Sequence, residues 1–94
     1  MLTLKIAADT KPADAAGAIA GQLREQRRVM LQAVGAAAVN QGVKALALAD
    51  LYMLQEERCV VSRARTITTS IGGKPRTAVQ WLAWVAKAPE KVTK

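Results

Sequence analysis

The dipeptide Gly72-Gly73 restricts the folds open to this chain more than any other feature. It lies between Arg58–Ile71, a run rich in threonine and β-branched residues, and a second run of the same kind. A two-residue type I′ turn needs a positive φ at both central residues, and glycine adopts this conformation without a Cβ penalty. The sequence therefore predicts two adjacent antiparallel strands joined by a tight hairpin.

The loop length also predicts the register of this hairpin. If the two glycines alone form the loop, Arg65 lies opposite Gln80 and Arg63 lies opposite Leu82. A bulge in the first strand would change which of its residues share that face. Leu82 and Trp84 then point away from the predicted helices, and a second subunit is the simplest cover for them, so we expect these two residues in the interface of a homodimer or a higher homo-oligomer.

The N-terminal part of the chain predicts a strand followed by a helix. Residues 2–8 place apolar side chains at alternate positions, as a strand with one buried face does. Thr10 is the expected cap, Pro12 suits the first turn, and the helix should end near Gln26. Its predicted buried side consists of Ala16, Ile19, Ala20 and Leu23.

Gly17 and Gly21 lie four residues apart in this helix. Each glycine costs up to about 1 kcal/mol of helix propensity relative to alanine. We expect close packing against the helix backbone as the compensation.

A second strand and a second helix follow. Val29–Val34 reads as a short central strand, Gly35 permits a turn, and the helix is predicted over about Ala36 to Leu51. The predicted buried stripe of this helix is Val39, Val43, Leu46 and Ala47.

The predicted order is strand, helix, strand, helix, strand, strand, which indicates a two-layer α/β fold. Right-handed crossovers place both helices on one face of a four-stranded mixed sheet and leave the other face open. We assign residues 1–87 to this single domain and residues 88–94 to a basic, disordered tail.

The charge of the chain indicates a polyanionic partner. Fourteen Lys and Arg residues against seven Asp and Glu residues give a net charge of +7 for 94 residues. Residues 58–87 contain six basic side chains and no carboxylate. Such a segment suits nucleic acid, although a merely solvated basic strand pair is the alternative.

Catalytic and metal-binding chemistry finds few of its usual residues here. The chain has no histidine and one cysteine, Cys59. The commonest general base and the usual zinc ligands are therefore missing, and we expect neither an enzyme nor a metal or other cofactor. No secretory signal or membrane span is visible, so we expect a cytoplasmic protein without a membrane partner or a small-molecule substrate.

The predicted hairpin tip combines a narrow turn with positive charge. Gly72 and Gly73 fit a nucleic-acid groove, and Lys74 and Arg76 follow at once to meet phosphates. A plain tight hairpin is the alternative interpretation.

Several blocks of the sequence, in the same order, resemble the stage V sporulation protein S family. They are AGAIAGQLRE at 16–25, QAVGA at 32–36, VNQGVKA at 39–45 and RTAV at 76–79. The resemblance covers about residues 2 to 85.

This resemblance implies an Alba-like fold with strand order 1-2-4-3, nucleic-acid binding as a dimer, and a link to sporulation control. It also implies which positions face nucleic acid: the hairpin from Gly72 to Arg76, the loop residue Lys11, and Asn40 with Lys44 at the start of the second helix.

Two functional hypotheses follow. The first is a non-enzymatic, dimeric nucleic-acid binder of low sequence specificity, acting on DNA or RNA. Its phosphate contacts are Arg63, Arg65, Lys74 and Arg76, extended by Lys11 and Lys44. The alternative is a regulatory protein-interaction module that docks a partner on the open sheet face through Leu82 and Trp84.

Overall fold

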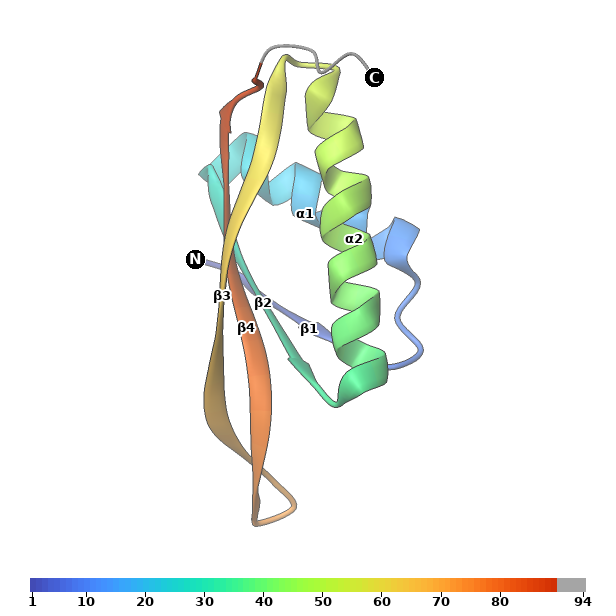
Figure 1. Ribbon diagram of the computed structural model, residues 1–94, viewed down its shortest axis with the longest axis vertical. Coiled ribbons are helices and arrows are strands. Elements are labelled where there is room, and N and C mark those ends of the chain that lie inside the picture. The colour runs from blue at the N-terminus through green and yellow to red at the C-terminus, as the bar shows by residue number, and fades with distance from the viewer. Residues whose placement is uncertain (90–94) are drawn as a thin grey trace.

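A computed structural model of the protein describes residues 1–89. Its elements are β1 (Thr3–Ile6), α1 (Pro12–Gln26), β2 (Arg28–Val34), α2 (Ala36–Leu54), β3 (Arg58–Ile71) and β4 (Lys74–Lys87). The strands form one sheet in the order β1-β2-β4-β3, in which β1 and β2 are parallel and the other pairs antiparallel. Both helices lie on one side of the sheet (Figure 1). The predicted two-layer α/β fold is confirmed, including the strand order that the family resemblance implies.

The core lies between α1, α2 and one face of the sheet. The buried side chains of α1 include the four predicted ones, Ala16, Ile19, Ala20 and Leu23. The sheet contributes Val29, Leu31 and Ala33 from alternate positions of β2. Full burial of a leucine, isoleucine or valine side chain stabilises a fold by roughly 1.5–3 kcal/mol, so this layer contact holds β2 against α1.

The start of α1 differs in one respect from the prediction. Pro12 begins the helix as expected, but Lys11 is the N-cap residue and no side chain caps the helix. The Thr10 hydroxyl instead accepts a hydrogen bond of 2.8 Å from the backbone N–H of Ala7. Thr10 therefore stabilises the turn between β1 and α1, and its predicted capping role is wrong.

The expected close packing at Gly17 and Gly21 is also wrong. A Cβ placed on either glycine meets nothing within 4 Å. The close approach lies in α2, where an ideal Cβ on Gly42 would lie 2.8 Å from Cη2 and from Cζ3 of Trp81. Gly42 therefore lets the α2 backbone rest on the indole ring that β4 projects toward it.

The buried stripe of α2 is shifted from the predicted one. Val43 is 52% exposed and Ala47 is exposed, whereas Val39 and Leu46 are half-buried against the core. The buried residues are Ala38, Gly42, Ala45, Ala49 and Met53. Small side chains make up most of this stripe, and the smallest residue, Gly42, lies over the Trp81 ring.

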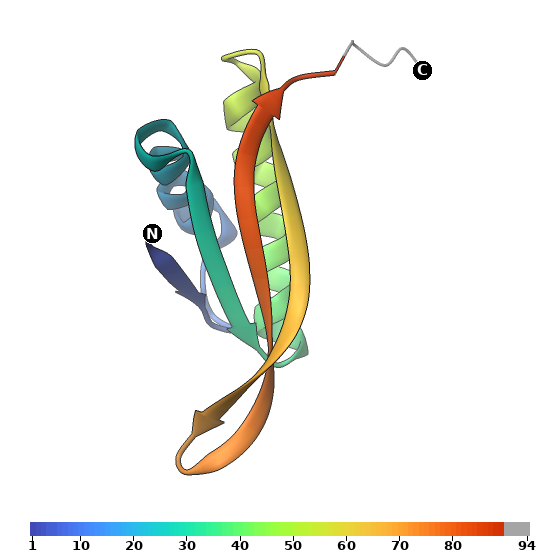
Figure 2. The same ribbon diagram turned by 90° about the vertical axis from the view of Figure 1, so that its left-hand side faces the viewer.

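The hairpin follows the predicted register without a bulge. Arg65 pairs with Gln80, and Arg63 pairs with Leu82. Gly72 and Gly73 have φ values of 59° and 78°, so both adopt the positive φ that a type I′ turn requires. The ends of β3 and β4 project as a two-stranded arm beyond the rest of the sheet (Figure 2).

The boundaries of the molecule follow from these elements. Strand β4 ends at Lys87, and the predicted tail, residues 88–94, lies largely outside the described residues, since only Ala88 and Pro89 belong to them. Among residues 1–89, neither helix combines the length and hydropathy that crossing a bilayer requires.

The contact between Gly42 and Trp81 predicts an asymmetry between two glycine substitutions. Gly42→Ala should lower the free energy of unfolding by about 1–3 kcal/mol, because the new methyl group overlaps a buried ring. Gly17→Ala should raise it by up to about 1 kcal/mol, because its Cβ meets open space in a helix. Urea unfolding of both variants checks this, and equal stabilities would contradict the close approach.

Candidate nucleic-acid interface

The sheet face that points away from the helices carries a set of exposed cations. Paired residues of neighbouring strands lie on the same face, so the register assigns each side chain to one side. The cations on this face, all exposed, are Lys5, Arg28, Arg63, Arg65, Lys74 and Arg76. We call this surface the cationic face.

None of the four strands contains a carboxylate. The acidic residues of the described chain lie in the helices and connections, and two of them have local partners. Glu56 forms an ion pair with Arg24, at 2.7 Å, and Asp50 accepts a 2.8 Å hydrogen bond from the backbone N–H of Val60. The charges are thus separated into a mixed helical layer and a positive sheet face, which is the arrangement that attracts a polyanion.

The arm presents a different surface on each of its two sides. Lys74 and Arg76 point to the side of the cationic face, as the pairing with Ile71 and Thr69 shows. The opposite side is rich in hydroxyl groups, contributed by Thr66, Thr68, Ser70 and Thr77. These hydroxyls were not predicted as part of the binding surface, although their alternate spacing is visible in the threonine-rich run of the sequence. Hydroxyls and cations are both common partners of nucleic-acid phosphates.

The structure separates the predicted binding residues into two groups. Arg63, Arg65, Lys74 and Arg76 share the cationic face and its arm, with Gly72 and Gly73 at the exposed tip. Lys11, Asn40 and Lys44 are exposed on the helical layer instead.

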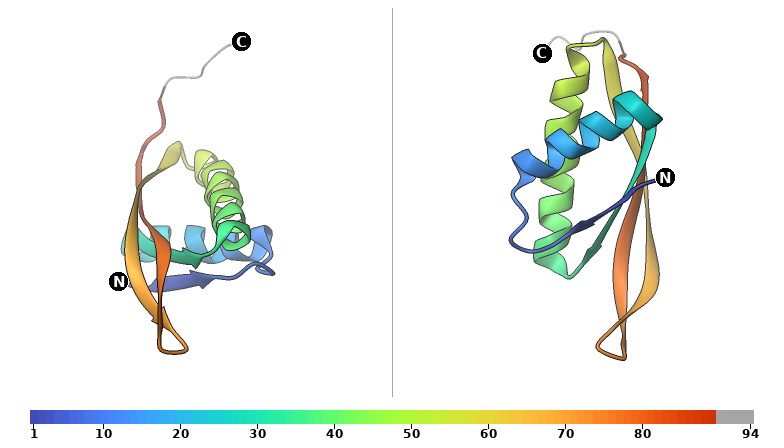
Figure 3. Two further views of the ribbon diagram at one scale, coloured as in Figure 1. Left: turned by 60° about the horizontal axis from the view of Figure 1, so that its bottom comes forward. Right: turned by 180° about the vertical axis from the view of Figure 1, so that it is seen from behind.

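A hydrogen bond holds the two parts of this second group together. The side-chain amide of Gln41 donates to the backbone oxygen of Thr10, at 2.9 Å, and so joins the loop before α1 to the first turns of α2. Both segments lie at the end of the molecule from which the arm projects (Figure 3). Lys11 and Asn40 therefore belong to segments at the same end of the molecule as the arm, and Lys44 follows about one turn further along α2.

The centre of the cationic face is apolar. Met30, Val61, Leu82 and Trp84 all lie on it and are half-buried. The prediction that Leu82 and Trp84 point to the open face is confirmed, whereas Trp81 is only 6% exposed and faces α2.

A small hollow of about 100 Å³ opens in this apolar centre. It is lined by Met30, Leu82, Gln80, Arg63 and Arg65. Arg65 donates to the side-chain oxygen of Gln80 at 3.4 Å, and the Gln80 amide donates to the oxygen of Gln32 at 3.0 Å. Sequence reasoning missed Lys5, Arg28, Gln32 and Met30, because β1 and β2 join this surface only through the strand order.

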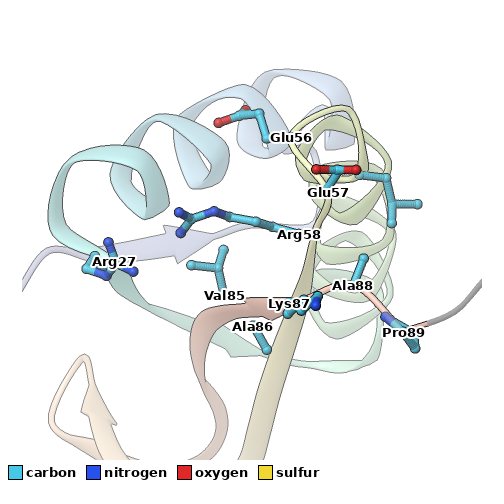
Figure 4. Close-up of a pocket in the computed structure, with 10 residues that line it drawn as sticks. Arg27, Glu56, Glu57, Arg58, Val85, Ala86, Lys87, Ala88 and Pro89 are labelled. Carbon is cyan, nitrogen blue, oxygen red and sulfur yellow. The ribbon is translucent and has the colours of Figure 1, made fainter.

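A larger cavity of about 900 Å³ lies at the end of β3 and β4 that is farthest from the arm (Figure 4). Its lining has mixed charge, with Arg27, Arg58 and Lys87 beside Glu56 and Glu57. Arg58 extends across this cavity from the start of β3 (Figure 4). Within residues 1–89, no three His, Cys, Asp or Glu side chains are grouped so as to hold a metal ion.

These features define a class: a small two-layer α/β protein whose open sheet face is cationic and ends in a protruding arm. A comparison with protein families adds that the family model for stage V sporulation protein S (SpoVS) matches residues 2–86. The chain therefore belongs to the SpoVS family, a family of sporulation-related regulators that is not known as an enzyme family. The family resemblance of the sequence blocks is confirmed.

The turn geometry makes a prediction about the arm. Gly72→Asn should preserve the hairpin, because asparagine tolerates a positive φ in a type I′ turn. Gly72→Val should strain the turn by roughly 1–2 kcal/mol and loosen the end of the arm. Amide hydrogen exchange at Ile71 and Lys74 reports this directly, and equal protection in both variants would show that the tip does not depend on the turn type.

Proposed function

We propose that the protein is a non-enzymatic nucleic-acid-binding regulator of low sequence specificity. The observation that carries this proposal is the cationic face: six exposed cations on a sheet whose strands contain no carboxylate. Cations of this kind displace the counterions that surround a polyphosphate, and this release supplies most of the affinity in nonspecific binding.

The arm is the part of this surface best placed to reach a nucleic-acid backbone. Its tip is narrow because Gly72 and Gly73 have no side chains, so it can enter a groove. Lys74 and Arg76 lie directly behind the tip, and Arg63 and Arg65 continue the positive surface toward the sheet. Contacts of these residues with phosphates carry no sequence information, which accounts for the low specificity.

Lys11, Asn40 and Lys44 extend this binding surface around the base of the arm. Their exposure and their position at the same end of the molecule support a contact with the same nucleic-acid backbone.

We place the protein in the cytoplasm. A chain with the single cysteine Cys59 suits the reducing conditions of this compartment.

The apolar centre favours a second candidate function, a protein-interaction module. Leu82 and Trp84 would then contact an acidic protein partner, and the cations around them would pair with its carboxylates. Under this alternative, binding to nucleic acid is weak and insensitive to changes in the arm.

Homodimerisation through Leu82 and Trp84 stays a prediction, and a dimer formed in this way would bury the surface that any other partner of the apolar centre needs. Both residues lie on the open face, as such a contact requires. Analytical ultracentrifugation of the wild type and of Leu82→Ser tests it, and a dimer that this substitution splits would support the contact.

The proposed function predicts a change in the salt dependence of binding. If about five phosphates are neutralised, the logarithm of the affinity for duplex DNA should fall with the logarithm of salt concentration at a slope near −4 to −5. The double variant Lys74→Ala/Arg76→Ala should bind more weakly at about 50 mM salt, with a slope that is smaller by roughly 2. Fluorescence anisotropy with a labelled duplex measures both quantities.

The matched control is a variant that loses two positive charges near the end of β4 farthest from the arm. Arg27→Gly/Lys87→Ala also lowers the net charge by two, and glycine suits position 27, where φ is 66°. This control should keep most of the affinity and of the salt slope. An arm variant that binds as tightly as the wild type would remove the arm from the proposed interface.

A further inference from the structure

We infer that the hollow in the cationic face binds an unpaired nucleobase, so that the preferred ligand is single-stranded nucleic acid. This inference deepens the proposed function and rests on it. It assigns base contacts to the apolar centre, whereas the arm and the residues around it contact phosphates.

The lining of the hollow combines the groups that hold a flat aromatic molecule. Met30 and Leu82 supply an apolar surface, and Arg63 and Arg65 complete the lining beside Gln80. Arginine stacks on aromatic rings through its planar guanidinium, and splayed bases in single strands are held by such stacking. A base in this hollow therefore meets apolar contacts and positive charge together.

Gln80 adds a hydrogen-bonding group at the edge of the hollow. Its amide already donates to Gln32 at 3.0 Å, and its oxygen accepts from Arg65 at the long distance of 3.4 Å. The edge of a bound base can replace Arg65 as the hydrogen-bond partner of the Gln80 oxygen. Little binding free energy is lost in this exchange, because the replaced hydrogen bond is weak. Because an amide both donates and accepts hydrogen bonds, Gln80 can pair with any of the bases, in keeping with low sequence specificity.

Trp84 provides an aromatic surface on the same face. It follows Leu82 by two positions in β4, which separates the two side chains by about 7 Å along the strand. Neighbouring bases, and not one base, would therefore contact the hollow and the indole.

A duplex cannot use this surface in the same way. Its bases are paired and stacked inside the helix, so only their edges reach a protein. A hollow lying within a sheet face requires a base that has left the stack. The phosphate contacts of the arm do not distinguish the two forms, and the discrimination must come from the hollow and Trp84.

Charge argues against a second copy of the chain as the cover of the apolar centre. A two-fold interface sets one surface against itself. Arg28 and Arg63 flank the centre. The described strands contain no carboxylate that could neutralise the same two arginines of a second copy. Like charges across an interface cost affinity, whereas the phosphates of a single strand compensate the same arginines.

The test compares oligo(dT) of about a dozen nucleotides with a duplex of equal length, using wild type, Trp84→Leu and Leu82→Ser. The wild type should bind the single strand more tightly than the duplex. Trp84→Leu keeps an apolar side chain but removes the aromatic surface, and should weaken single-strand binding about five- to a hundredfold while leaving duplex binding unchanged. Leu82→Ser should act in the same direction. The salt slope of both variants should stay at the wild-type value, because no cation is removed.

Tryptophan fluorescence gives a readout that a purely structural role would not change. Oligo(dT) should quench the emission of the wild type and not that of Trp84→Leu, which retains only the buried Trp81. Leu51→Ser is the matched control, since Leu51 is 58% exposed on α2 in the opposite layer, and it should leave both binding and quenching unchanged.

Several outcomes would overturn the inference without touching the proposed function. Equal affinity for duplex and single strand, with Trp84→Leu unchanged for both, would assign binding to the arm alone. Substitutions that alter sedimentation and not single-strand binding would assign the apolar centre to a second copy. Failure of the proposed function itself is distinct, because the wild type would then bind neither nucleic acid at about 50 mM salt.

Discussion

The contact between the α2 backbone at Gly42 and the indole of Trp81 determines which side of β4 faces the helices. Side chains alternate along a strand, so a shift of one residue would exchange the two faces of the sheet. With Trp81 fixed under α2, Ala83 also turns inward and is fully buried. Gln80, Leu82 and Trp84 must then lie on the open face. The packing of one glycine against one ring therefore decides which residues of β4 lie on the open face. The small buried residues of α2 let the helix lie close enough to the sheet to maintain this contact.

Separation of charge follows from the same arrangement. Carboxylates of the described chain lie in the helices and connections, and two of them, Glu56 and Asp50, have local partners. The ion pair between Arg24 and Glu56 is solvent-exposed, with side-chain exposures of 47% and 43%, so it contributes little stability. Asp50 satisfies the backbone N–H of Val60 in the edge strand β3. Neither interaction reaches the open face, and its positive potential is left without compensation from the sheet itself. A net charge of +7 would be unremarkable for binding if it were spread evenly, and its concentration on one face is what favours a polyanion.

Sequence patterns predicted the structure well where a structural position accepts few residue types. A two-residue type I′ turn needs a positive φ at both central residues, which glycine adopts without strain, so the Gly72-Gly73 turn, the register and the pairing of Arg65 with Gln80 were all predicted correctly. The sequence of helix α2 distinguishes its buried side less clearly from its exposed side, because alanine occurs equally well in both positions. The predicted stripe through Val43 and Ala47 was therefore wrong. The close packing expected at Gly17 was wrong because a tolerated glycine and a required one look alike without knowledge of the ring beneath. On the cationic face, the arginines of the hairpin were predicted from the local pattern. Lys5, Arg28 and Gln32 were not, since their place on this face depends on strands that are distant in sequence.

Strand β4 joins the two parts of the proposed interface. It pairs with β3 along its whole length, but with β2 only from Ala78 to Trp84. Beyond Ala78 the hairpin is a two-stranded ribbon, and such ribbons twist and bend more readily than a sheet with neighbours on both sides. The hollow beside Leu82, by contrast, lies where β4 is flanked by two strands and backed by the core. The arm can therefore adapt to the path of a phosphate backbone, while the sheet keeps the proposed base-binding surface fixed. In the proposed complex, the adaptable arm accounts for tolerance of sequence, and the rigid centre accounts for selection between paired and unpaired bases.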